Sequence, residues 1–437
     1  MKPIHHPIHP VAPRLILVWA AWAALWASRG NAEEVGWQVL DRDAAVRAAL
    51  AQNLELRAAN WEVKKARARL RWSGKLDAPE LGLSASTDQL GLDDDESVLE
   101  IGIAQRFPLT DRLKREKAVS RVEVAMAEAE IADARRKLIG QVERQFYQTR
   151  VAQEEIGQLA EIRELLSGFV KTLQRQVEQG TVSSLDVNQA KLDLQQIEKE
   201  WQRQKTEAER QMGTLKTLLG VANGTRLSLQ DKLELPEGEP GAPDRERARN
   251  RRPDFQLAVL KGDKARAELA LAESNRWEDV AVRLFAQREA TLDEPTGLER
   301  NHFVGVGVTI PLPLKRERVT DVPTAEVGQA EDESRALALR IENEVAAAAK
   351  VRSELLTLAR DTAGETLQLA EENLDAISKA YSNGQIELLK YQRAQEQLLK
   401  ARLGALGSLA SYLQAEVDLR EAAASHPDID VLDDVSK

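Results

Sequence analysis

Few side chains beyond the N-terminal segment are suited to catalysis or to metal binding. The two histidines there, His302 and His426, lie far apart in the sequence, and neither has a second ligand-type residue at the spacing of a metal site. The same isolation argues against a Ser-His-Asp site. The chain contains no cysteine, which excludes thiolate ligands, a cysteine nucleophile and disulfides. We therefore expect no catalytic, metal or cofactor site, and a protein that is not an enzyme.

Two further patterns have simpler structural interpretations. The run Asp93-Asp94-Asp95-Glu96 could bind Ca²⁺, but it lacks the ligand spacing of a calcium loop, so a solvated hairpin tip is the favoured interpretation. Gly305 and Gly307 are not followed by the Lys-Ser/Thr pair of a phosphate loop. They are better explained as relieving crowding inside a barrel.

The composition favours long helices over thick globular cores. Of the 437 residues only 4% are aromatic, and Lys plus Arg (61) are outnumbered by Asp plus Glu (71), giving a net charge of -10. Ala, Leu, Glu, Lys and Arg make up roughly half of the chain, which is typical of coiled coils and long helices. The acidic balance argues against a nucleic-acid partner, because phosphate binding needs a basic face.

Residues 1–32 resemble a secretory signal peptide. A basic start precedes the apolar run Leu15 to Ala27, and the small residues Gly30 and Ala32 fit a cleavage site before Glu33. An uncleaved anchor is the alternative, but the apolar run is shorter than the roughly 20 residues that span a bilayer. Because no later stretch is long and apolar enough for a transmembrane helix, we expect an exported protein of the periplasm or the outer membrane.

The rest of the chain contains one unit twice. We divide it into a first repeat (33–235), a linker rich in Pro, Gly and Glu (236–243), a second repeat (244–424) and a C-terminal tail (425–437). The matching segments, in order, are Asn53-Leu54-Glu55-Leu56 with Arg252-Pro253-Asp254-Phe255, Lys65-Ala66-Arg67-Ala68 with Lys264-Ala265-Arg266-Ala267, Phe107-Pro108-Leu109 with Ile310-Pro311-Leu312, and Gly180 with Gly384.

Each repeat is predicted to begin with an amphipathic helix, at about 41–75 and 244–276, followed by a β-hairpin, at 79–107 and 279–312. In the first hairpin, Leu99, Ile101 and Ile103 alternate with polar or small residues, the pattern of a strand with one apolar face. The strand lengths suit tilted membrane-spanning strands, although a soluble hairpin packed on a helix is an alternative. The polar segments 91–96 and 290–300 are predicted as loops. Four strands cannot close a barrel alone, so membrane strands would require several chains to share one.

After each hairpin the sequence predicts a long helical hairpin. About 65 residues before Gln179 contain no proline, and a helix of that length spans roughly 100 Å, which is typical of a coiled coil. The helices are predicted to turn near Gly180 and near Gly384, where glycine can adopt the left-handed C-cap conformation.

These segments resemble the TolC-type outer-membrane factor family over about residues 41–424. The most specific likenesses are the two turns, Val177-Glu178-Gln179-Gly180 through Asp186 to Ala190, and Tyr381-Ser382-Asn383-Gly384 through Leu389, Ala394 and Leu398. Phe107-Pro108-Leu109 is similar to the heavy-metal efflux branch. The resemblance implies a mainly α fold with a small β part, in which long α-helical hairpins form a periplasmic α-barrel and four strands per chain contribute to a trimeric 12-strand transmembrane β-barrel.

The resemblance also implies a function. It is that of the outer-membrane channel of a tripartite efflux system, a passive homotrimeric exit duct in outer-membrane lipid that extends into the periplasm. Its partners would be a periplasmic adaptor (membrane fusion protein) and an inner-membrane pump, of RND rather than ABC type, and its cargo metal cations or drugs. The alternatives are a soluble periplasmic coiled-coil adaptor and a type I protein-secretion duct.

Adaptor docking and gating are expected at the helix turns. The residues implied are Gly180, Thr181, Val182, Ser183, Asp186, Tyr381, Gly384, Gln385, Ile386, Lys390 and Arg393. The chain departs from the family in two ways. It lacks the cysteine that many relatives lipidate, and Lys390 and Arg393 stand where well-known members carry acidic residues. These basic residues would either reverse the local field of a constriction or extend to solvent and pair with Glu387 and Glu396.

Overall fold

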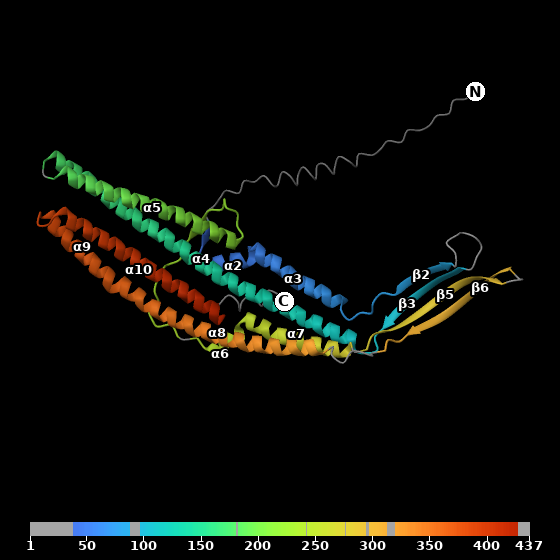
Figure 1. Cartoon of the computed structure of the whole chain (residues 1–437). Coiled ribbons are helices and arrows are strands. Elements are labelled where there is room, and N and C mark those ends of the chain that lie inside the picture. Colours follow the sequence, from blue (N-terminus) through green and yellow to red (C-terminus); the bar gives the residue numbers. More distant parts are fainter. Residues whose placement is uncertain are drawn as a thin grey trace, which may run out of the picture.

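The computed structural model describes residues 38–87, 97–180, 182–241, 243–275, 277–293, 297–312 and 320–426. The predicted signal peptide, the acidic run Asp93 to Glu96, Thr181 and the tail from 427 onward lie outside the described residues. The chain forms a long rod, with a β-sheet at one end and the turns of two helical hairpins at the other (Figure 1).

Helices make up most of the rod. Those of the first repeat are α2 (Arg42–Gln52), α3 (Leu54–Trp72), α4 (Arg112–Glu178) and α5 (Ser184–Leu219). Those of the second repeat are α6 (Arg245–Arg251), α7 (Pro253–Ser274), α8 (Asp321–Asp361), the π-helical segment η1 (Thr362–Thr366), α9 (Leu367–Ser382) and α10 (Leu388–Ala423). None of the described helices combines the length and the apolar character needed to cross a bilayer.

The opening helix of each repeat is broken, and the prediction of one continuous helix was wrong in both places. In the first repeat, Asn53 leaves the helical conformation and its side chain accepts a hydrogen bond of 2.8 Å from the Leu56 N–H, which starts α3 afresh. In the second repeat, Arg252 is extended because it precedes Pro253, the first residue of α7.

The four predicted strands form one antiparallel sheet. They are β2 (Glu80–Thr87), β3 (Ser97–Phe107), β5 (Val280–Asp293) and β6 (Gly297–Thr309), in the order β2-β3-β5-β6. The pairing of β3 with β5 joins the two repeats. The predicted loop 290–300 is largely strand instead, since Ala290 pairs with Arg300; polar side chains do not stop a ladder whose backbones remain in register.

The two faces of the sheet differ as predicted. Leu99, Ile101 and Ile103 are each about half exposed on one face. On the opposite face, Glu100 forms an ion pair with Arg283 of the neighbouring strand. The sheet thus presents an uncovered apolar surface on one side and a polar surface on the other.

A second, two-stranded sheet was not predicted. β1 (Gln38–Leu40) pairs in parallel with β4 (Leu227–Leu229), and three residues are too few to show an alternating pattern in a sequence. This sheet lies beside the largest hydrophobic cluster, where α2, α4, α5 and α10 meet around side chains such as Phe146, Leu215 and Val417. The predicted fold class, mainly α with a small β part, is confirmed.

Candidate docking and gating site

The two helical hairpins turn at the same end of the rod, opposite the sheet (Figure 1). The first hairpin consists of α4 and α5, and the second of α9 and α10. The sequence-predicted site residues other than Thr181 therefore lie on one end of the molecule, although they come from segments about two hundred residues apart in the chain.

The first turn follows the C-terminus of α4. Gly180 has φ +70° and its N–H donates to the Val177 carbonyl at 3.0 Å, as in a glycine-terminated helix. Ser183 then caps α5, since its hydroxyl accepts from the Leu185 N–H at 3.1 Å. Val182 and Asp186 are half-buried, whereas Gly180 and Ser183 are exposed.

The second turn is a Schellman motif. Gly384 has φ +71° and donates to the Tyr381 carbonyl at 2.9 Å, while the Gln385 N–H donates to the Ala380 carbonyl at 3.0 Å. Gly384 and Gln385 are exposed, and Ile386 is half-buried. A Cβ added to either turn glycine would meet no atom within 4 Å, so the positive φ, and not crowding, requires glycine there.

Lys390 and Arg393 lie in the first turns of α10 and are both exposed. Neither forms an ion pair with any side chain in the described part of the chain; Glu396 pairs with Lys400 instead, at 2.6 Å. The pairing with Glu387 and Glu396 that helical spacing permits is therefore not formed. Both cations point their charge toward solvent in the single chain.

An aromatic cluster joins the two hairpins beside their turns. The rings of Tyr381 (α9) and Tyr391 (α10) stack with centroids 5.2 Å apart, and Phe169 (α4) lies 5.4 Å from Tyr391 and 6.2 Å from Tyr381. Leu388, in the first turn of α10, also packs on the α4–α5 cluster around Leu173. Phe169, Leu388 and Tyr391 were not singled out from the sequence; the available signal was that two of the chain's four tyrosines flank Gly384.

A charged residue of the first hairpin also affects the ionisation of Tyr381. Burial raises the pKa of its phenol, and the nearby Asp186 carboxylate of α5 raises it further because a second negative charge would be repelled. The neutral phenol is therefore the form that this contact stabilises. Of the predicted residues, the structure brings Asp186 and Tyr381 together, while Lys390 and Arg393 take no part in the contact.

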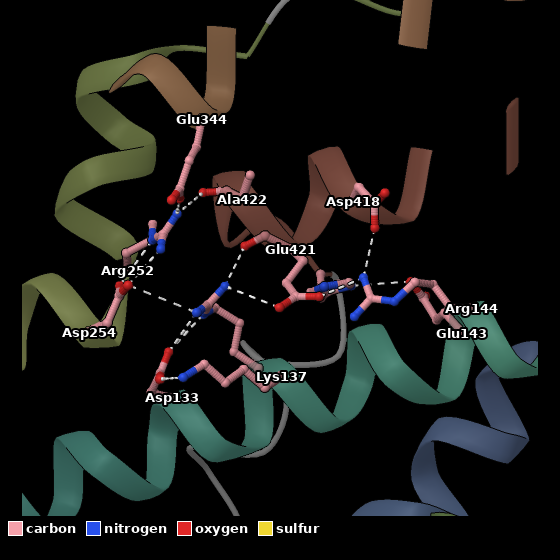
Figure 2. A network of polar contacts seen from close by, with 12 residues as sticks. Asp133, Lys137, Glu143, Arg144, Arg252, Asp254, Glu344, Asp418, Glu421 and Ala422 are labelled. Atoms are coloured by element: carbon pink, nitrogen blue, oxygen red, sulfur yellow. Dashed lines mark hydrogen bonds and ion pairs between the residues drawn. The ribbon is translucent and has the colours of Figure 1, made fainter. Parts of the chain in front are cut away.

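A buried polar network joins the repeats near the middle of the rod (Figure 2). Arg136 of α4 is 3% exposed and donates to Asp133 at 2.7 Å and to the Glu421 carbonyl of α10 at 2.9 Å. It also lies 4.0 Å from the carboxylate of Asp254 in α7. A guanidinium with several donors in a fixed plane suits such a three-helix junction.

Arg252 extends the network to α8. It makes two hydrogen bonds to Asp254, of 2.6 and 3.0 Å, and one of 2.7 Å to Glu344. Burial by itself raises the pKa of the Asp254 carboxyl, but Arg252 and Arg136 outweigh it and hold that pKa below its ordinary value. The carboxylate is thus charged in the folded chain.

His426 lies at the end of the described chain, buried against Glu143. Its Nδ1 is 3.4 Å from the Glu143 carboxylate, which also contacts Arg420 at 3.5 Å and Arg42 at 3.6 Å. These groups keep the pKa of Glu143 low despite its burial. Among the described residues, no three His, Cys, Asp or Glu side chains are grouped so that they could hold a metal ion; His302 is exposed on β6.

Comparison with known proteins identifies the family. The family model described as outer membrane efflux protein matches residues 45–221 and 245–425. The chain belongs to the outer membrane efflux protein family. The two matched stretches fall on the two copies of the repeated unit, and the predicted resemblance to the TolC-type family is confirmed.

Three similar proteins share little sequence identity with the chain. The chain is 23% identical over 292 residues to the cobalt-zinc-cadmium resistance protein CzcC of Cupriavidus metallidurans, covering 66% of this chain and 68% of that protein. The CmeC outer membrane channel of Campylobacter jejuni superposes with a TM-score of 0.72 at 16% identity, covering 91% of this chain and 89% of CmeC. CusC gives a TM-score of 0.70 at 18% identity, covering 87% and 91%. These likenesses establish the fold.

Proposed function

We propose that this protein is the outer-membrane channel of a tripartite efflux system, a passive homotrimeric exit duct that extends into the periplasm. The observation that carries the proposal is the match to the efflux family over both repeats, combined with two helical-hairpin turns at the end opposite the sheet. In this arrangement the sheet lies in the outer membrane and the turns face the inner-membrane partners.

The sheet supports an assembly of several chains. Its order ends at β2 on one side and β6 on the other, and the uncovered apolar face would lie against lipid. Open strand edges leave backbone groups without hydrogen bonds, which costs several kcal/mol each in hydrocarbon. Three sheets joined edge to edge would remove all the open edges.

The helix turns are the proposed site of docking and gating. The exposed segments around Gly180 and Gly384 are available to the hairpins of a periplasmic adaptor. Opening requires the α9–α10 hairpin to move away from α4–α5, which breaks the Phe169–Tyr381–Tyr391 cluster. Adaptor contact at the turns would favour the open arrangement.

The cargo that we propose is a divalent metal cation, by likeness to CzcC, with drugs as the alternative. The described residues contain no group of three metal-ligating side chains, so selection would belong to the pump, for which we propose the RND type. The family match disfavours the alternative of a soluble periplasmic adaptor. If the protein exports neither metal cations nor drugs, we expect a type I protein-secretion duct.

Complementation tests the proposal. In a strain lacking this protein, growth on cobalt, zinc or cadmium salts, or on drugs, should return with the wild-type gene. Gly180→Val combined with Gly384→Val should abolish that growth while the protein still reaches the membrane, because valine tolerates positive φ poorly. The matched control is Gly168→Ala, on the exposed face of α4 with open space around it. Survival of transport in the double variant would contradict the docking assignment, and recovery of the mature wild-type protein from the soluble periplasm would contradict the duct.

A further inference from the structure

The apolar face of the four-stranded sheet is charged in only one area. Directly opposite residues of antiparallel strands lie on the same face, so this face includes one row across all four strands: Leu83, Ile101, Ala286 and Val304. No carboxylate lies on this face among the described side chains of the strands. Residues such as Glu100, Glu289 and Glu299 fall on the opposite, polar face.

The charged area consists of Arg288, Arg300 and His302. Arg288 of β5 lies directly opposite His302 of β6, and Arg300 lies diagonally across from Arg288. Directly opposite Cβ atoms are about 4.5–5.5 Å apart and diagonal ones roughly 7–8 Å, so the three side chains share one small area. All three are exposed. In the described part of the chain, none of them forms an ion pair.

The depth of this area in a membrane follows from the strand length. The β5–β6 hairpin points away from the helices (Figure 1), so in the proposed duct its tip faces the outer surface. His302 lies eight residues from Ile310, which is about 27 Å along a strand and roughly 20 Å across a bilayer at a tilt near 40°. The apolar band of membrane barrels is about 25 Å tall. The three basic residues thus lie near the outer edge of the band, where lipid headgroups begin.

The chemistry of this area suits a phosphate group. An arginine that faces lipid is costly at the middle of a bilayer and far less so near its surface. A guanidinium can bind a phosphate through two parallel hydrogen bonds, and an imidazole supplies a further donor. Since no carboxylate shares this face among the described side chains, an anion placed here meets only opposite charge.

We infer that Arg288, Arg300 and His302 bind the phosphorylated headgroup of an outer-leaflet glycolipid of the lipid A type. The phosphate lies on the two arginines, and the acyl chains lie along the exposed aliphatic rows that include Val304 (89% exposed) and Val306 (66% exposed). The site thus combines an anion-binding group with an apolar surface that continues from it. The inference rests on the proposed outer-membrane duct and adds a lipid ligand to it.

Lipid binding by the full-length oligomer tests the inference. The protein is purified in a neutral detergent until no bound lipid remains and is titrated with diphosphoryl lipid A, and native mass spectrometry counts the bound lipids. The wild type should bind this lipid and should not bind lipid A from which both phosphates have been removed. Arg288→Gln combined with Arg300→Gln should weaken binding by roughly tenfold or more, because each arginine near an anionic lipid contributes separately.

Two variants serve as matched controls. Arg288→Lys combined with Arg300→Lys keeps both charges and should retain most of the binding. Arg106→Gln removes a cation from the polar face of the same sheet, where Arg106 pairs with Glu80 at 3.2 Å, and should bind like the wild type. All samples are compared at equal amounts of assembled oligomer. If the double glutamine variant does not assemble, Arg300→Gln alone should show a smaller loss of binding. Unchanged binding in the glutamine variants, or an equal loss in Arg106→Gln, would overturn the site.

The lipid site and the proposed duct fail in distinguishable ways. Displacement of the lipid by an equal concentration of inorganic phosphate would show that the site recognises the free ion, and would overturn the lipid assignment. If the protein fractionates with the outer membrane but binds no lipid A, the duct stands and the lipid site is wrong. If the mature protein is recovered from the soluble periplasm, the duct and the lipid site are overturned together.

Discussion

Arg136 and Arg252 are two buried cations that link helices near the middle of the rod. Each is less than 10% exposed; Arg136 joins helices of both repeats, and Arg252 shares the Asp254 carboxylate with it and reaches Glu344. Buried charges of this kind are held in place by several partners at once, so the loss of one partner leaves an uncompensated charge. By contrast, the numerous pairs along the outer helix faces, such as Arg210 with Glu207, are exposed and contribute little.

Asp254→Asn should destabilise the folded protein by about 3 kcal/mol at neutral pH, because Arg136 and Arg252 each lose one of the carboxylates that balance their buried charge. The native pKa of Asp254 is depressed, so its stabilising effect is present above the ordinary carboxyl value near 3.8 and is lost as pH falls through the lower, native value. Thermal unfolding from pH 7 to pH 2 would show the difference between wild type and variant shrinking toward acid pH. Asp418→Asn is the control, since that carboxylate is 56% exposed and pairs with Arg144 alone among the described side chains. An equal effect of the two substitutions would contradict this account.

Tyr391→Ala should weaken the contact between the hairpins, because two ring contacts are lost at about 0.5–1.5 kcal/mol each. We expect the purified channel to conduct more often in planar bilayers, and cells to admit large antibiotics. Tyr391→Phe keeps the ring and should behave like the wild type. Unchanged conductance of the alanine variant would show that this cluster is not part of the gate.

At the scale of the elements, close contact between a side chain of one strand and the backbone of its neighbours fixes how the strands pack. In the sheet, Phe285 of β5 is in register with Gly102 of β3 and Gly305 of β6. A Cβ added at Gly305 would lie 2.5 Å from the Phe285 ring. The two glycines thus make room for the one aromatic side chain on this row, so an otherwise polar face can remain closely packed.

Gly305→Ala should therefore reduce the yield of assembled, membrane-inserted protein, since the Phe285 ring must leave its site. Gly307→Ala is the matched control on the same strand and face, where the nearest atom to an added Cβ is 3.8 Å away. The measurement is the fraction of heat-resistant oligomer in gels of membrane extracts. Equal yields from both variants would remove the steric explanation.

At the scale of the whole molecule, the two copies of the repeated unit have different neighbours. Helix α7 packs with both α4 and α8, whereas α3, at the equivalent place in the first repeat, packs extensively only with α4 among the described elements. The sheet shows the same organisation, with β3 paired to β5 inside the chain and β2 and β6 at its ends. Both the helical part and the sheet thus keep uncovered edges in the described single chain.

Much of the architecture is determined locally and could be predicted from the sequence. The strand faces around Leu99 to Ile103 follow from alternation, the helix turns from Gly180 and Gly384, and the internal repeat from matching motifs, because each depends on neighbours within a few positions. The helix breaks at Asn53 and Arg252 also have local causes, a side-chain cap and a following proline. They were not predicted because the apolar periodicity continues across both positions.

Tertiary structure alone decided what distant residues do. The sequence assigns His426 and Phe169 no partners; folding places the first against Glu143 and the second against Tyr381 and Tyr391. Long-range contacts of this kind depend on how whole helices are aligned with one another. A short stretch of sequence contains no information about that alignment. The same holds for the exposed Trp61 and Val322. In the sequence they are ordinary apolar positions, and only the packed rod shows that they are exposed while Leu260 and Val119, at the matching places of the other repeat, are half-buried and buried.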